Sequence, residues 1–209
     1  ANLTLLQCEN FKVNNINICP VYFPNISYMS EIIKYKKLTW SLGGFYKKKT
    51  YRNKTFLCGP NGIIRLSIPV NKVGKTDNEK SICYNQNWRL SHWKTILNCY
   101  SSSPFFDFYY SDIKKIFFED YNVLSHFNIA LIGKISSLLN FKLDFKKTIQ
   151  IVEDINDNEK LIQIKSENGK KFPKYPQVFE YKFGFIENLS VLDLIFNLGP
   201  ESNNYLNSI

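Results

Sequence analysis

An apolar stripe between residues 113 and 138 restricts the possible folds of this chain more than any other feature. Its members recur at helical steps, and they are Ile113, Ile116, Phe117, Leu124, Phe127, Leu131, Ile135 and Leu138. Residues at this spacing share one face of an α-helix. We therefore expect one long helix that begins at Asp112, a residue type that caps helix N-termini, and buries this face in a core.

A second helix is predicted over residues 87–100. Its apolar stripe consists of Trp93, Ile96, Leu97 and Tyr100. The adjoining face carries four more residues at helical spacing, namely Trp88, His92, Thr95 and Cys99. Both faces are expected to pack into the interior, since polar residues cover the remainder of the helix.

Two apolar runs, 50–58 and 63–70, are predicted to pair as a hairpin. The residues between them are Gly59-Pro60-Asn61-Gly62, and Asn-Gly favours a tight turn because both residues tolerate positive φ. The remaining predictions before the C-terminal segment are a helical stretch at 27–35, a strand at 142–152, and charged loops at 71–80 and 153–171.

The C-terminal segment carries the signals of one short, capped helix. Ser190 precedes the apolar run 191–196, and Gly199-Pro200 follow it. Ser190 with Asp193 resembles a capping box. Gly199 is expected to adopt the left-handed conformation that ends many helices, and Pro200 to prevent their continuation.

Together these elements predict an α+β (mixed α/β) fold. We expect a single compact domain over residues 1–209, with N-terminal strands and a hairpin, two central helices and a short capped C-terminal helix. A length of 209 residues suits one domain. No apolar run approaches the roughly 18 residues of a membrane-spanning helix, so no membrane span is expected.

The composition of the +9 formal charge argues against a nucleic-acid partner. Lys and Arg number 27 against 18 Asp and Glu, but only three of the basic residues are Arg. The abundant Lys, Asn, Ile, Phe and Tyr share A/T-rich codons, which indicates an A+T-biased genome such as that of a reduced bacterial symbiont. A nucleic-acid-binding protein gathers its charge into a patch, whereas much of the Lys here is scattered.

The cysteines and histidines make a metal site unexpected. The five cysteines are odd in number and include no CxxC pair, which indicates a reducing cytoplasm rather than a disulfide framework. Only two histidines are present, so zinc chemistry is not expected. The usual nucleotide-binding, zinc-protease and serine-hydrolase signatures are missing as well. We therefore expect neither a metal nor a cofactor.

The two histidines have different predicted environments. His126 lies nearly opposite the apolar stripe of its helix and is expected to face solvent. His92 borders an aromatic face between Trp88 and Thr95, a partly desolvated position that suits a general acid or base. The alternative is a histidine at the edge of the core that bonds a backbone or Thr95 oxygen, and the sequence favours this alternative.

Arg52 stands out because Lys dominates the basic residues. It lies in Tyr51-Arg52-Asn53, among Lys47, Lys48, Lys49 and Lys54. A planar guanidinium binds a phosphate or a carboxylate through two N–H groups at once, so this segment is a candidate anion site. The alternative is a solvated basic strand end in which Arg52 bridges two structural carboxylates, and the sequence leaves both open.

A third candidate region joins Gln177, Asn188 and Asp193. Such neutral and acidic hydrogen-bonding groups suit the recognition of sugar hydroxyls, and aromatic neighbours are present to cover ring faces. The alternative is that Asn188, Ser190 and Asp193 only cap the C-terminal helix. The sequence favours capping for Ser190 and leaves the role of Asp193 open.

The order of five sequence blocks resembles the WbqC-like family of bacterial proteins. The resemblance extends from about Cys19 to Leu206. The blocks are 20–28, 50–54, Trp88 with His92-Trp93-Lys94, 100–106, and 175–179 followed by 184–186 and 188–201. Five blocks in this order are far more specific than any single short motif.

This resemblance implies a cytoplasmic bacterial protein associated with the synthesis of O-antigen and other surface polysaccharides. We accordingly expect a transferase or sugar-modifying enzyme with a small-molecule substrate, an activated sugar such as a sugar nucleotide. The predicted catalytic residues are His92, as general base, and Asp193. The predicted substrate-binding residues are Tyr51, Arg52, Asn53, Gln177 and Asn188, with Arg52 on the anion. The alternative is a non-catalytic binding or scaffold protein.

Overall fold

Two strands near the N-terminus and one from the second half of the chain form a small parallel sheet. The computed structural model describes residues 15–35, 37–150, 156–164 and 171–209. The strands are β1 (Ile16–Ile18), β2 (Leu38–Ser41) and β5 (Phe145–Thr148), and β2 pairs in parallel with both others. β5 confirms a strand within the predicted range 142–152, of which residues 151 and 152 lie outside the described residues.

Helix α1 (Ile26–Ile32) connects β1 to β2 and confirms the helical stretch predicted at 27–35. The side chain of Asn25 caps it by accepting a hydrogen bond from the Tyr28 N–H at 2.8 Å. Almost every residue of α1 is buried. The helix therefore lies inside the molecule, and it positions the preceding segment 19–25 against the core.

The predicted hairpin is confirmed as β3 (Lys54–Gly59) and β4 (Gly62–Ser67), although residues 51–53 of the predicted first strand form a turn instead. Gly59 pairs with Gly62, so Pro60 and Asn61 form the turn between the strands. Gly62 has a φ of 102°, whereas Asn61 does not adopt a positive φ. The conformational freedom that the turn needs is therefore provided by the glycine.

Three helices follow the hairpin, namely α2 (Trp88–Tyr100), α3 (Phe106–Phe117) and α4 (Leu124–Leu138). Helix α2 packs against β3, and α3 packs against both α2 and α4. Helix α2 confirms the prediction over residues 87–100. The single long helix predicted from Asp112 is wrong, because the chain leaves helical geometry after α3 and Asp112 lies inside that helix. Both α3 and α4 bury the apolar stripe in one core, which is why the periodicity continues across the break.

Arg89 bonds the segment that separates α3 from α4. From the first turn of α2, its guanidinium donates to the carbonyl oxygens of Phe118 and Glu119 at 3.4 and 2.7 Å. It also donates to the Tyr84 hydroxyl at 2.7 Å and pairs with the Asp120 carboxylate at 3.1 Å. Carbonyl groups at a helix C-terminus have no partner within the helix, so the fork of Arg89 stabilises the end of α3.

Replacing Arg89 by Lys is expected to lower the free energy of unfolding by about 1–2 kcal/mol, because one ammonium group cannot reach the same set of acceptors. Urea denaturation followed by circular dichroism measures the change. Arg65→Lys is the matched control, since Arg65 is exposed on β4 and surface substitutions usually change stability by about 0.5 kcal/mol or less. Equal losses in the two variants would contradict the capping role.

The C-terminal helix begins and ends at the predicted residues. α7 (Val191–Leu198) follows Ser190, whose hydroxyl accepts the Leu192 N–H at 3.3 Å. Gly199 ends it with a φ of 57°, as expected, but its ψ of −128° lies outside the left-handed helical region. A Cβ at Gly199 would lie 2.4 Å from the Phe105 ring, so glycine is needed for space as well as for φ.

Further helices lie where the sequence predicted none. A 3-10 turn (Gly199–Glu201) leads into α8 (Ser202–Ser208), so Pro200 begins a new helical segment rather than ending the helical chain. Helix α5 (Asn156–Ile162) occupies part of the predicted charged loop 153–171, and α6 (Glu180–Phe183) is a single turn. The loop prediction is therefore wrong for residues 156–162.

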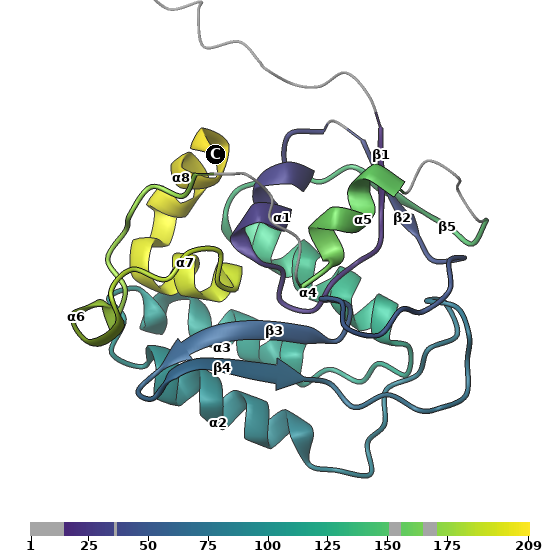
Figure 1. Cartoon of the computed structure of the whole chain (residues 1–209), viewed down its shortest axis with the longest axis horizontal. Helices are drawn as coiled ribbons and strands as arrows, with labels where there is room; N and C mark the ends of the chain where they lie inside the picture. The colour runs from purple at the N-terminus through teal and green to yellow at the C-terminus, as the bar shows by residue number, and fades with distance from the viewer. Residues whose placement is uncertain (1–14, 36, 151–155, 165–170) are drawn as a thin grey trace, which may run out of the picture.

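The elements confirm the predicted α+β fold. Figure 1 shows the β3–β4 hairpin across the lower half of the molecule, with α2 below it. The β1-β2-β5 sheet lies above the hairpin at the right, and α7 and α8 lie above it at the left. The buried apolar side chains of both sides belong to one continuous core. Within the described residues, we find no helix that is long and apolar enough to cross a bilayer.

Candidate functional site

Arg52 forms a buried ion pair with Asp77. Its Nε lies 2.8 and 2.9 Å from the two carboxylate oxygens of Asp77. The two side chains are only 4% and 5% exposed to solvent. Arg52 lies in the turn that precedes β3. Asp77 lies in the loop 71–80, where its N–H bonds the Gly44 carbonyl. The alternative of a solvated strand end in which Arg52 bridges two carboxylates is therefore wrong, because Arg52 is buried and pairs with the single carboxylate of Asp77.

Cys19 joins this ion pair through its sulfur. Arg52 donates from Nη2 to the Cys19 Sγ at 3.1 Å, and the Cys19 thiol donates to Oδ2 of Asp77 at 3.4 Å. Cys19 is 2% exposed and follows β1 directly. Its carbonyl accepts the Tyr28 hydroxyl at 2.7 Å, which anchors the turn to α1. We call Cys19, Arg52 and Asp77 the Cys19 cluster.

One nitrogen of the Cys19 cluster has no partner. Nη1 of Arg52 is buried and makes no hydrogen bond to the described residues. A buried donor without an acceptor costs about 1–3 kcal/mol, so Nη1 calls for an explanation such as a water molecule, an ion or a role in binding. Other buried polar atoms of the described residues, Trp40 Nε1 and Arg89 Nε among them, are also without a partner.

Burial controls the ionisation of the Cys19 cluster. It raises the pKa of the Cys19 thiol from 9.0 to about 12 and also raises the pKa of Asp77, although Arg52 opposes both shifts. Burial disfavours the charge on Arg52, but Cys19 and Asp77 outweigh it, so the pKa of Arg52 is raised. At neutral pH Cys19 is therefore a thiol and Arg52 a guanidinium, and the hydrogen bonds from Arg52 favour the ionised form of Asp77.

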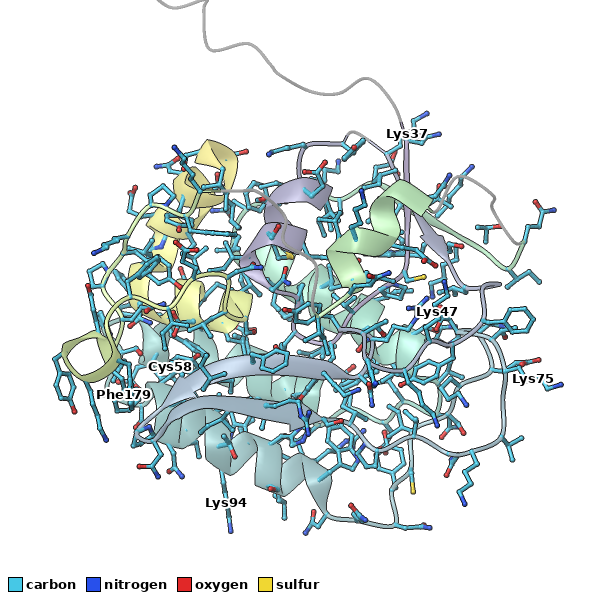
Figure 2. The ribbon with its side chains drawn as sticks, in the orientation of Figure 1. Lys37, Lys47, Cys58, Lys75, Lys94 and Phe179 are labelled. Carbon is cyan, nitrogen blue, oxygen red and sulfur yellow. The ribbon has the colours of Figure 1, made fainter. Side chains whose placement is uncertain are left out.

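An exposed ion pair lies close to the Cys19 cluster. Lys47 and Glu159 are 2.6 Å apart, with side chains 53% and 22% exposed. Lys47 acts electrostatically on Asp77, and Glu159 acts on both Cys19 and Arg52. The cluster therefore lies just below the surface, on the side where Figure 2 shows Lys47.

A second polar network surrounds Asp193 in the first turn of α7. Oδ2 of Asp193 accepts hydrogen bonds from the Tyr175 hydroxyl at 2.6 Å and from Gln177 Nε2 at 2.9 Å. Gln177 also bonds both the N–H and the carbonyl of Ile186, each at 2.9 Å. The predicted site residues Gln177 and Asp193 are thus in direct contact, and the carboxylate of Asp193 does not cap the helix.

Asp193 is 1% exposed, and this burial raises its pKa from 3.8 to about 6. The hydrogen bonds from Tyr175 and Gln177 act in the opposite direction, because they favour the ionised carboxylate. Asp193 also raises the pKa of the Cys58 and Cys99 thiols, although burial is the main cause in both. The Asp193 network therefore lies near the end of β3 that carries Cys58.

His92 is buried among aromatic side chains of the core. Its Nδ1 lies 2.9 Å from the Tyr22 hydroxyl, and the ring also bonds the Ser67 backbone. Burial lowers the pKa of His92 from 6.5 to about 4, so the imidazole is neutral at pH 7. Thr95 bonds the Ser91 carbonyl instead. These contacts match the core-edge alternative, with Tyr22 and Ser67 as the partners.

The other predicted binding residues bond neighbouring segments. Asn53 donates to the Ile68 carbonyl at 2.8 Å. Asn188 has a φ of 53° and accepts the Ser27 N–H at 2.9 Å. The Tyr51 side chain bonds Asn25, and its ring packs against Phe56. The contacts of Asn188 with Ser27 and of Tyr51 with Asn25 each join one sequence block to another.

The predicted site residues fall into separate groups. Figure 2 shows Lys47, beside the Cys19 cluster, and Cys58, beside the Asp193 network, on opposite sides of the molecule. Lys54 and Cys58 are about 13 Å apart along β3 at the usual strand rise. In the part of the chain that the structure describes, no hydrogen bond joins His92, Arg52 and Asp193 to one another.

The sequence reasoning missed Cys19 and Asp77. Cys19 lies in an apolar run, where a small buried cysteine is ordinary. Asp77 lies in a segment predicted only as a charged loop, 25 residues from Arg52. No spacing rule connects the three residues. Among the described residues, no three His, Cys, Asp or Glu side chains are grouped as metal ligands.

Comparisons with known proteins agree with the sequence blocks. The model of the WbqC-like protein family matches residues 19–171. The uncharacterized protein Rv1507c of Mycobacterium tuberculosis is 22% identical to the chain over 219 residues, which cover 88% of the chain and 91% of that protein. No solved structure matches the chain significantly.

Proposed function

Because this chain belongs to the WbqC-like protein family, we propose that it is a cytoplasmic enzyme of bacterial surface polysaccharide synthesis. It acts as a transferase or sugar-modifying enzyme on a small phosphate-bearing substrate, such as an activated sugar. The observation that carries this proposal is the unpartnered Nη1 of Arg52, buried beside a thiol and a carboxylate.

The geometry of Arg52 supports an anionic substrate. Nε of Arg52 donates to Asp77, and Nη2 donates one hydrogen to the Cys19 sulfur. The N–H groups of Nη1 are therefore left to bond a ligand. Arginine binds phosphate oxygens through two parallel N–H groups, and such charge-assisted bonds strengthen where water is excluded. Lys47 also lies nearby, where its charge is paired with Glu159. A nucleic acid is not proposed as the partner.

The remaining predicted residues have supporting roles in this proposal. Tyr51 and Asn53 flank Arg52 and fix the backbone that carries it. His92 is neutral, as a general base must be, but its ring nitrogens are engaged by Tyr22 and Ser67. Gln177 and Asp193 bind substrate hydroxyls only if the Asp193 network opens, and Asn188 only if it releases the Ser27 N–H. Arg52 is therefore the residue to test first.

Arg52→Lys is expected to weaken the binding of a nucleotide sugar about tenfold, because a single ammonium group cannot reproduce the bidentate contact. Isothermal titration calorimetry with a panel of uridine and thymidine diphosphate sugars measures the dissociation constants. Arg65→Lys is the control, since it makes the same change at an exposed position. Circular dichroism checks that both variants are folded. The absence of binding by the unmodified chain, or equal affinities in all three proteins, would contradict the proposal.

A second candidate function is a non-catalytic binding or scaffold protein. The observation that favours it is the packing of the sequence blocks against one another in the core. The Tyr22 N–H bonds the Tyr51 carbonyl at 3.0 Å, and the Val191 N–H bonds the Pro24 carbonyl at 2.8 Å. Binding of a nucleotide sugar without any turnover, in the presence of candidate acceptors, is the result that distinguishes this function from a transferase.

A further inference from the structure

We propose that Cys19 is the nucleophile of a covalent acyl-transfer step, with Asp77 as its base and a phosphate-activated acyl group as the substrate. This inference rests on the proposed function, because it places the phosphate of the substrate on Arg52. It narrows the substrate class to a carboxyl group joined to phosphate in a mixed anhydride. The acyl group is then passed from Cys19 to a hydroxyl or amino group of a sugar.

The contacts of the sulfur support this role. A nucleophile that is weak at its own pKa needs an adjacent base within hydrogen-bond reach. The Cys19 thiol donates to Oδ2 of Asp77 at 3.4 Å, so the proton has an acceptor before the reaction begins. Arg52 donates to the same sulfur at 3.1 Å and stabilises negative charge as it forms there.

The free Nη1 of Arg52 lies where the reacting group needs a donor. Because Nη1 and Nη2 belong to one planar guanidinium, Nη1 is adjacent to the N–H group that bonds Sγ. In a tetrahedral intermediate on the sulfur, the oxyanion and the departing phosphate oxygen both lie next to Sγ. A donor on this side of the sulfur is therefore able to bond either of them.

The step balances without a further reactant. The sulfur attacks the acyl carbon, a C–S bond forms, and the C–O bond to phosphate breaks. The thiol proton moves to the Asp77 carboxylate and then to the departing phosphate. The product is a thioester on Cys19 and a free phosphate. In the second half, a sugar hydroxyl or amine attacks the thioester, and its proton restores the thiol.

Burial of the Cys19 cluster has two effects on this reaction: it raises the pKa values of the reacting groups, and it excludes water. The raised pKa of Cys19 means that the resting thiol needs Asp77 to remove its proton, and the raised pKa of Asp77 makes that carboxylate a stronger base. Exclusion of water protects a thioester from hydrolysis. Cys58 provides a contrast within the same protein, because its buried thiol points to the Gly59 carbonyl at 3.9 Å rather than to a carboxylate.

Acetyl phosphate is the probe for this step. The full chain is incubated with it, quenched in acid and analysed by intact mass and by peptide mapping. We expect a single acetyl group on Cys19 that hydroxylamine removes, as it removes thioesters but not lysine amides. Asp77→Asn is expected to slow the acetylation of Cys19 at least tenfold. Cys19→Ala abolishes the labile label, whereas Cys58→Ala, the matched control, retains it.

Peptide mapping of the unmodified chain tests whether Cys19 is acylated even if a variant fails to fold. A label confined to lysines, an equal label on Cys19 and the partly exposed Cys83, or no label at all would overturn the inference. If nucleotide sugars still bind in an Arg52-dependent manner while Cys19 stays unlabelled, the inference fails and the proposed function stands. If binding and labelling both fail, both are rejected.

Discussion

Removing the carboxylate of Asp77 by Asp77→Ala is expected to lower the free energy of unfolding by about 3–5 kcal/mol. The reason is that Arg52, whose side chain is 4% exposed, keeps its charge and loses the anion that compensates it. Breaking one side of a buried ion pair costs this much because the remaining ion is neither solvated nor paired. Urea denaturation of the unmodified chain and of Asp77→Ala, fitted with the same baseline slopes, measures the difference in the free energy of unfolding.

Two further variants separate the cost of the lone charge from the loss of packing. Asp77→Asn retains an oxygen that accepts from Nε of Arg52. We therefore expect it to lower the free energy of unfolding less than Asp77→Ala does. The double variant Arg52→Met with Asp77→Ala removes both charges and is expected to recover most of the stability, as buried pairs do when they are replaced by apolar side chains. Both proteins are measured under the conditions used for Asp77→Ala.

Glu159→Gln is the matched control for the exposed ion pair nearby. Glu159 bonds Lys47 at 2.6 Å, but the lysine side chain is 53% exposed. Exposed pairs contribute about 1 kcal/mol or less, since water solvates each partner when the other is removed. A loss for Asp77→Ala no larger than that for Glu159→Gln would show that water reaches Arg52, and it would contradict the burial of the cluster.

The parts of the fold that the sequence predicted correctly are stabilised by local signals. The β3–β4 turn depends on Gly62, and α7 begins at the Ser190 cap, so both could be located from a few adjacent residues. The break between α3 and α4 has no such signal. Residues 118–123 contain neither Gly nor Pro, and the break is stabilised from α2 by Arg89, which periodicity cannot reveal.

The candidate site also contains residues that could be predicted from the sequence and residues that could not. Arg52 could be selected from the sequence because it is one of only three arginines in a Lys-rich chain. Its partners could not, because Cys19 and Asp77 come from distant segments that tertiary packing brings together. Gln177 and Asp193 lie in one sequence block and were predicted together. Their burial, which makes the network a structural element, followed only from the fold.

Asp193→Asn is expected to remove a pH dependence of stability worth about 3 kcal/mol. Burial raises the folded-state pKa of Asp193 from 3.8 to about 6. The contribution of this carboxyl group is therefore fully present below pH 3.8 and is lost as the pH rises through about 6, because the unfolded chain releases the proton first. At 1.36 kcal/mol for each pKa unit, the total is about 3 kcal/mol.

The asparagine preserves the contacts of the network. Its side-chain oxygen accepts the same bonds from Tyr175 and Gln177 that Oδ2 of Asp193 accepts, but it carries no charge. Relative to the unmodified chain, the variant is thus expected to gain stability between about pH 4 and about pH 7. Urea denaturation at several pH values measures this gain. Asp144→Asn is the control, since Asp144 is exposed in the loop before β5.

His92 acts in the opposite direction, so the measured quantity must be the difference between the variant and the unmodified chain. Burial lowers the folded-state pKa of His92 from 6.5 to about 4, so its contribution is present above pH 6.5 and is lost as the pH falls towards 4. Between these values the slopes of His92 and Asp193 largely cancel in the unmodified chain. Both proteins contain His92, so its contribution cancels in the difference in stability between Asp193→Asn and the unmodified chain. A difference for Asp193→Asn that does not change with pH would show that the carboxyl group of Asp193 titrates alike in the folded and unfolded states.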